Sequence, residues 1–188
     1  MMRENGNLRY TTLLFDVDNT LLNFDASEEE AFKSLLLHFG MEPKDSLLQE
    51  YHQINRSCWE LFEEGKIEKE EVLLRRFEIF FSRHNCQADG KEAEAFYRER
   101  LGDSAILIPG ALELCRDLSR KYDLYVVTNG VADTQYRRLK SSGLDPYFKG
   151  LFVSEEAKSP RKNFSSTALN RCGFSAWNVP RREDGKCF

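Results

Sequence analysis

Apolar and polar positions follow a strand-like pattern near both ends of the chain. Residues 10–15 form an apolar run that stops at Asp16, and residues 124–127 and 151–153 repeat this pattern. Such runs are typical of strands buried on both faces of a parallel sheet. Helical patterns separate the later strands at residues 111–120 and from 132 to about 142. Strands that alternate with helices predict the α/β class, with a doubly wound parallel sheet.

The pattern changes to a helical period after the first strand. From about Ala26, apolar residues recur every three or four positions, and Gly40 closes this segment. Further helical patterns cover residues 46–62, 69–84 and 90–101. The sequence therefore predicts a discontinuous α/β core of residues 1–23 and 104–188, interrupted by a helical block of residues 24–103.

Composition narrows the class of protein. The chain has 188 residues, of which 41% are hydrophobic and 31% charged, and its net charge is −4. A mildly acidic chain without a basic run does not favour binding to nucleic acid. The sequence contains no apolar stretch of 18 residues, so it predicts no membrane-spanning helix, and no secretory signal is visible. The five cysteines form no C-x-x-C pair, which favours reduced thiols in a cytoplasmic protein. The sequence leaves the oligomeric state open.

Candidate chemistry begins directly after the first predicted strand. Asp16 and Asp18 are two residues apart in a turn at the carboxyl end of that strand, where open α/β sheets bind their ligands. One carboxylate could attack phosphorus while the other transfers the leaving-group proton. Paired carboxylates also suit Mg²⁺. The ordinary alternative is a turn with two solvated aspartates.

A second polar position follows the next strand. The hydroxyl of Thr128 and the backbone N–H groups after it could hold phosphate oxygens. The alternative is a simple turn made by Asn129 and Gly130. Two such positions, each at a strand end, favour a phosphate site.

The two motifs resemble those of a known superfamily. Residues 14–21, Leu-Phe-Asp-Val-Asp-Asn-Thr-Leu, look like motif one of the haloacid dehalogenase-like (HAD) hydrolases, and residues 125–130, Tyr-Val-Val-Thr-Asn-Gly, look like motif two. Other segments are similar to its pyrimidine 5′-nucleotidase branch, namely residues 23–25, 109–111, 135–139, 142–145 and 152–156.

The resemblance implies a Rossmann-like core with a helical cap, residues 24–103, inserted after the first strand. It also implies hydrolysis of pyrimidine nucleoside 5′-monophosphates through a phospho-aspartyl intermediate on Asp16. Asp18 would protonate the leaving alkoxide and then activate water, and Thr128 and Asn129 would bind the phosphate. Mg²⁺ would be held by the Asp16 side chain, the Asp18 main-chain carbonyl and a later aspartate. The Asp18 carboxylate argues against the dehalogenases of the superfamily. The partner would be a small nucleotide, chosen by the helical cap.

The aromatic and histidine residues of the helical segment could contact a ligand or could simply belong to the core and the surface. Aromatic residues at helical spacing are more often core than ligand contacts. Phe24 is the best candidate for a contact with a base, because it lies at the predicted hinge near Asp16. Surface or capping roles are expected for the three histidines. The other aromatic candidates are Trp59, Phe62 and Phe96.

The family pattern breaks after Ala157. Lys158 is the first choice for the cation of motif three, with Arg161 and Lys162 as alternatives and a solvated basic turn as the plain explanation. No apolar run precedes Asp184, the one candidate for the acidic motif four. We therefore expect a core that is truncated after the third strand and the following helix, from a shortened or frameshifted product. An impaired enzyme and an interaction module remain as alternative functions.

Overall fold

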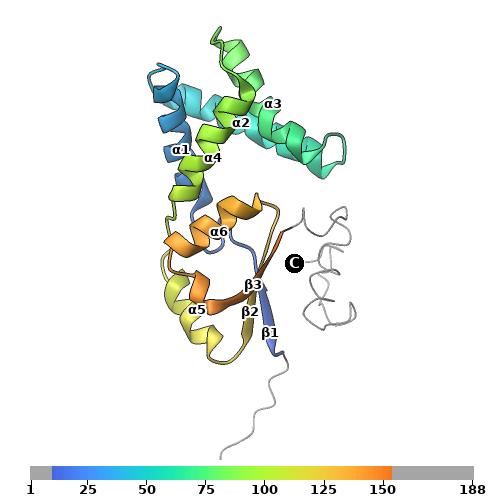
Figure 1. Cartoon of the computed structure of the whole chain (residues 1–188), viewed down its shortest axis with the longest axis vertical. Coiled ribbons are helices and arrows are strands. Elements are labelled where there is room, and N and C mark those ends of the chain that lie inside the picture. Colours follow the sequence, from blue (N-terminus) through green and yellow to red (C-terminus); the bar gives the residue numbers. More distant parts are fainter. Residues whose placement is uncertain (1–9, 154–188) are drawn as a thin grey trace, which may run out of the picture. The chain divides into compact units, whose positions relative to one another are not determined.

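The computed structural model describes residues 10–153 (Figure 1). The chain divides into two compact units, one made of Met1–Leu22 and Leu107–Phe188, and the other of Asn23–Ile106. The predicted helical segment, residues 24–103, falls inside the second unit. No helix within residues 10–153 is both long and apolar enough to cross a membrane.

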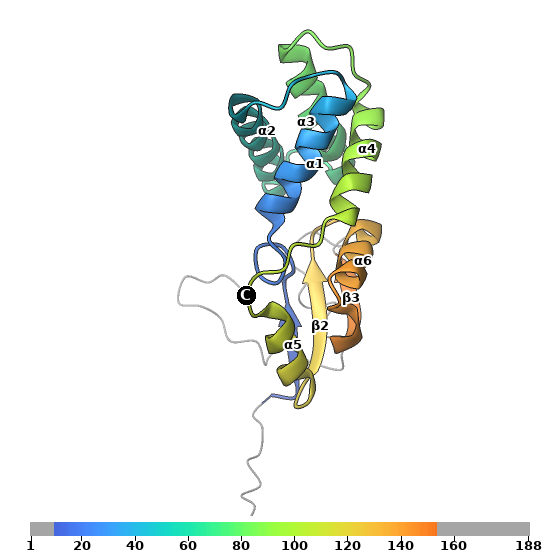
Figure 2. The ribbon, with the colours of Figure 1, turned by 90° about the vertical axis from the view of Figure 1, so that its left-hand side faces the viewer.

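The first unit contains a parallel sheet. Strands β1 (Thr12–Phe15), β2 (Asp123–Thr128) and β3 (Phe148–Val153) pair in the order β1-β2-β3. Helix α5 (Ala111–Ser119) precedes β2 and packs against it (Figure 2). Helix α6 (Ala132–Ser141) lies between β2 and β3 along the chain. A short 3₁₀ helix, η1 (Asp145–Tyr147), leads into β3. The predicted α/β class is therefore confirmed.

Strand β2 is the central strand of these three, and its side chains alternate. Leu124, Val126 and Thr128 are buried. Leu124 and Val126 belong to the apolar core that the sheet shares with α5 and α6. Strand β3 begins three residues earlier than the apolar run predicts. Lys149 and Gly150 interrupt the apolar pattern after Phe148, and the exposed Lys149 pairs with Asp123 at 2.6 Å.

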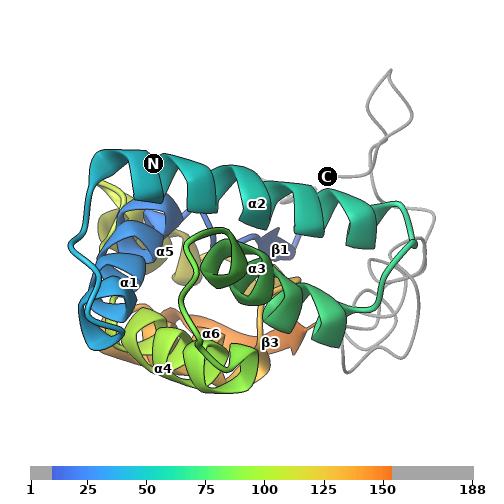
Figure 3. The same ribbon diagram turned by 90° about the horizontal axis from the view of Figure 1, so that it is seen from above.

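The second unit contains helices α1 to α4, which pack into a bundle (Figure 3). Its helix α1 begins earlier than predicted, because the side-chain oxygen of Asn23 accepts a hydrogen bond from the backbone N–H of Ala26 at 3.0 Å. The other helices lie within two residues of their predicted bounds. The four are α1 (Phe24–His38), α2 (Asp45–Glu63), α3 (Lys69–Arg83) and α4 (Gly90–Asp103).

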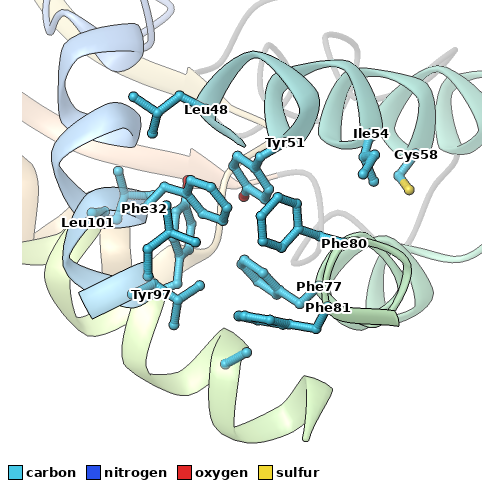
Figure 4. Packing of buried hydrophobic residues seen from close by; sticks show 14 of the residues in the cluster. Phe32, Leu48, Tyr51, Ile54, Cys58, Phe77, Phe80, Phe81, Tyr97 and Leu101 are labelled. Atoms are coloured by element: carbon cyan, nitrogen blue, oxygen red, sulfur yellow. The ribbon is translucent and has the colours of Figure 1, made fainter. Parts of the chain in front are cut away.

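Stacked aromatic rings fill the centre of the bundle (Figure 4). The ring of Tyr51 stacks on the ring of Phe32, with 3.8 Å between the centroids. It also stacks on the ring of Phe77, with 5.6 Å between the centroids. Aromatic side chains bury the largest apolar areas, so this cluster supplies most of the hydrophobic stabilisation of the unit. The helical unit thus has a core of its own.

Candidate active site

The turn after β1 holds the first two candidate residues in place. Val17 is completely buried, so the chain is anchored between Asp16 and Asp18. The carbonyl of Val17 accepts hydrogen bonds from the backbone N–H groups of Leu21 and Leu22 at 2.9 and 3.0 Å. These two leucines are also buried. The turn is therefore a fixed platform that carries two carboxylates beside the sheet.

The Asp18 carboxylate is held by two side chains of α6. Its Oδ1 accepts a hydrogen bond from Nη1 of Arg138 at 2.5 Å, and its Oδ2 accepts one from Nε2 of Gln135 at 2.7 Å. The Arg138 side chain is completely buried, whereas that of Asp18 is 27% exposed. Each oxygen of the carboxylate therefore has its own donor, and part of the group still reaches solvent.

Thr128 lies at the end of β2 and is connected to the same network. Its Oγ1 accepts hydrogen bonds from Gln135 Nε2 at 3.3 Å and from the backbone N–H of Gly130 at 3.0 Å. Strands β1 and β2 are parallel neighbours, so their carboxyl ends meet at one edge of the sheet. The structure thus brings together the Asp16–Asp18 turn and Thr128, which the sequence separates by more than a hundred positions.

Asp16 has a different environment from Asp18. The residue is exposed overall. Partial burial of its carboxyl nevertheless raises the pKa of Asp16, hydrogen bonding to the Val17 backbone opposes this rise, and the charge of Asp18 adds to it. A bound cation would favour the ionised form of Asp16.

The turn offers oxygen atoms of the kind that Mg²⁺ prefers, namely the Asp16 carboxylate and the Asp18 main-chain carbonyl. Within residues 10–153, no group of three or more His, Cys, Asp or Glu side chains could hold a metal ion. The donors of the turn therefore fit such an ion only as part of a larger set.

The remaining predicted residues divide between the two units. Asn129 follows Thr128 and is half-buried. Phe24 belongs to the helical unit and packs against its apolar core, as do Trp59, Phe62 and Phe96. Lys158, its alternatives Arg161 and Lys162, and Asp184 lie outside the described residues.

The three histidines all have partners within the helical unit. His52 contacts Glu28 at 2.8 Å, His84 contacts Glu50 at 2.9 Å, and His38 stacks on Phe96 at 4.2 Å. None of these contacts involves the α/β unit.

Gln135 and Arg138 are functional candidates that the sequence pattern does not single out, although both lie in the family-like segment of residues 135–139. Their spacing of three residues, directly after a strand that ends in Thr128, places both side chains on one face of a helix. This spacing was the available signal. It gave no partner, because Asp18 lies 120 residues away from Arg138 along the chain.

The fold is that of a hydrolase family. Residues 10–176 match the haloacid dehalogenase-like hydrolases, and the chain belongs to that family.

Particular relatives are similar over most of the chain. The protein named HAD-hydrolase YfnB of Bacillus subtilis (strain 168) is 41% identical over 165 residues, which cover 87% of this chain and 70% of YfnB. A crystal structure of YfnB bound to magnesium matches with a TM-score of 0.82, over 87% of this chain and 74% of that one.

Two further relatives are named as nucleotidases. Pyrimidine 5′-nucleotidase PynA of Streptococcus pneumoniae (strain ATCC BAA-255 / R6) is 37% identical over 88% of this chain and 72% of PynA. Pyrimidine 5′-nucleotidase YjjG of Escherichia coli (strain K12) is 28% identical over 88% of this chain and 73% of YjjG.

Proposed function

We propose that the chain is a magnesium-dependent phosphomonoesterase that hydrolyses pyrimidine nucleoside 5′-monophosphates. The observation that carries this proposal is the joint hydrogen bonding of Asp18 and Thr128 by one side-chain nitrogen of Gln135. This hydrogen bonding holds the Asp18 carboxylate beside the Thr128 hydroxyl, and Asp16 lies on the same turn as Asp18. In the proposal, Asp18 is the acid–base group, Thr128 binds phosphate and Asp16 is the nucleophile. The names of PynA and YjjG support the choice of substrate.

In the proposed reaction, an Asp16 carboxylate oxygen attacks phosphorus and the phosphorus–oxygen bond to the nucleoside breaks. Protonated Asp18 gives its proton to the departing 5′-oxygen. The product of this step is a phospho-aspartyl group on Asp16. Asp18, now ionised, takes a proton from water, and the resulting hydroxide attacks phosphorus. Inorganic phosphate leaves, and Asp16 is regenerated.

Two sets of groups from the chain would prepare the site for this reaction. Thr128 and Asn129 would bind the non-bridging phosphate oxygens through their side chains and the backbone N–H groups after them. Asp16 and the Asp18 carbonyl would hold magnesium, which when bound neutralises phosphate charge. The cap role of the helical unit, with Phe24 at its start, stays a prediction, as does the role of Lys158.

The test is magnesium-dependent phosphate release from dUMP, dTMP and UMP, with AMP as the purine comparison. Asp16→Asn removes the nucleophile, and Asp117→Asn is the matched control, because Asp117 is an exposed aspartate on α5. We expect release that needs magnesium, favours the pyrimidines, is abolished by Asp16→Asn and is unchanged by Asp117→Asn. Folded chain that releases no phosphate above the Asp16→Asn background would contradict the proposal.

A further inference from the structure

Two side chains of α6 bind Asp18 but carry out no step of the proposed reaction. We propose that Gln135 and Arg138 are positioning residues, which together hold the Asp18 carboxylate in the orientation that serves the leaving group. Gln135 additionally couples that orientation to Thr128. This inference rests on the proposed function. It concerns the two residues on which the proton transfer from Asp18 to the leaving group would depend.

The donors leave the Asp18 carboxylate little rotational freedom. Arg138 donates to Oδ1 and Gln135 donates to Oδ2, so a rotation of the carboxylate breaks both hydrogen bonds at once. The two donors also contact each other, since Arg138 Nη1 lies 3.5 Å from Gln135 Oε1. Both come from one rigid helix at a spacing of three residues, so they move together.

Burial distinguishes this ion pair from an ordinary surface pair. Arg138 is completely buried and Gln135 is 2% exposed. Burying a guanidinium is costly unless it is hydrogen-bonded and paired. Asp18 accepts the hydrogen bond of Arg138 and, when it is ionised, also supplies the opposite charge. Surface ion pairs, by contrast, fix side-chain orientation weakly, because water competes for each group. The pair therefore holds Asp18 from the protein side while its exposed part faces solvent.

Gln135 extends the same constraint to the predicted phosphate site. Thr128 Oγ1 accepts hydrogen bonds from Gln135 Nε2 and from the Gly130 N–H. A hydroxyl with both acceptor positions used still has its own O–H to donate. Thr128 is thereby set as a donor, which is the role that a phosphate oxygen requires. One amide thus orients both the proton donor and the phosphate-binding hydroxyl.

The positioning role has a consequence that a general structural role lacks. A ribose 5′-alkoxide needs a proton as it leaves, so its departure depends on how Asp18 is oriented. A 4-nitrophenolate is a stable anion and leaves without that proton. Loss of the positioning pair should therefore slow the nucleotide far more than the nitrophenyl ester. A defect in phosphate binding or folding would slow both equally.

The experiment compares kcat/KM for UMP and for 4-nitrophenyl phosphate in wild type, Gln135→Leu and Arg138→Gln. Lys140→Gln is the matched control, because it removes an exposed cation from the same helix. General acid catalysis contributes about 10²- to 10⁴-fold, so we expect the UMP value to fall roughly 10²-fold in both variants. The 4-nitrophenyl phosphate value should fall less than about threefold, since its leaving group needs little acid catalysis. Arg138→Lys should restore part of the loss.

Circular dichroism and thermal unfolding identify variants that have lost their fold. If Arg138→Gln does not fold, Gln135→Leu still tests the positioning role. This variant removes a neutral side chain and therefore leaves no buried charge without its partner. Equal losses for the two substrates in a folded variant, or no loss for UMP, would overturn the positioning role while wild-type activity upholds the proposed function. A wild-type chain inactive on both esters would overturn the proposed function and this inference together.

Discussion

Gly130 illustrates how closely the side chains of the site are packed. A Cβ atom at this position would lie 2.3 Å from Nε2 and 2.9 Å from Cγ of Gln135. Real Cβ atoms do not approach other atoms so closely, so any side chain here must displace Gln135. The glycine after Thr128 and Asn129 is therefore needed for the approach of Gln135, in addition to any role in the turn itself.

Gly130→Ala should lower activity much more than stability. The displaced amide can no longer hold Asp18 and Thr128 together, and misplacement by about 1 Å can cost on the order of 10²-fold in rate. The measurement is kcat/KM for UMP alongside the thermal unfolding midpoint.

The double variant Gly130→Ala/Gln135→Ala supplies the control. If the glycine acts through Gln135, the two losses should not add. Additive losses would show that Gly130 acts by another route.

At the scale of elements, a chain of buried polar groups connects all four helices of the second unit. Glu28 on α1 accepts a hydrogen bond from Asn55 on α2 at 2.6 Å, and Asn55 accepts one from Arg76 on α3 at 3.0 Å. Arg76 in turn donates to Glu94 on α4 at 2.7 Å. All four residues are at most 6% exposed. Because each partner comes from a different helix, the network fixes the register of the bundle.

Arg76→Met should strongly destabilise the helical unit, because it leaves the buried Glu94 carboxylate without its cation. Removing one partner of a buried ion pair typically costs about 3–5 kcal/mol. Denaturant unfolding followed by helical circular dichroism measures this loss.

Arg75→Met is the matched control for that change. The adjacent Arg75 pairs with Glu71 at 2.8 Å on the exposed face of the same helix, so its loss should cost about 1 kcal/mol or less. Equal effects of the two substitutions would contradict the importance of the buried network.

At the scale of the whole molecule, residues 10–153 build two hydrophobic cores from separate sets of side chains. The stacked aromatic cluster belongs to Asn23–Ile106, and the sheet core belongs to the other unit. The ends of the helical unit meet, since the backbone N–H of Asn23 donates to the carbonyl of Ile106 at 2.7 Å. A unit with its own core and adjacent ends is arranged as an inserted domain.

A fragment of residues 23–106 should therefore fold alone. We expect a helical circular dichroism spectrum and one cooperative unfolding transition, because its core and polar network lie wholly within the fragment. The same fragment with Arg76→Met tests whether the native polar network has formed. If it has, the variant fragment should unfold at a lower denaturant concentration than the unchanged fragment. A fragment that shows neither helicity nor cooperativity would contradict the independence of the unit.

The local pattern of the sequence determined the elements and the outline of the site. Apolar runs identified the three strands, a period of three to four identified the helices, and the ends of parallel strands brought Asp16, Asp18 and Thr128 to one edge. The tertiary structure alone decided which polar residues serve them. Arg138 and Arg76 stand in segments rich in charge, where exposure is the ordinary expectation. Their burial depends on partners distant in sequence, Asp18 and Glu94, and periodicity along one helix carries no information about such partners.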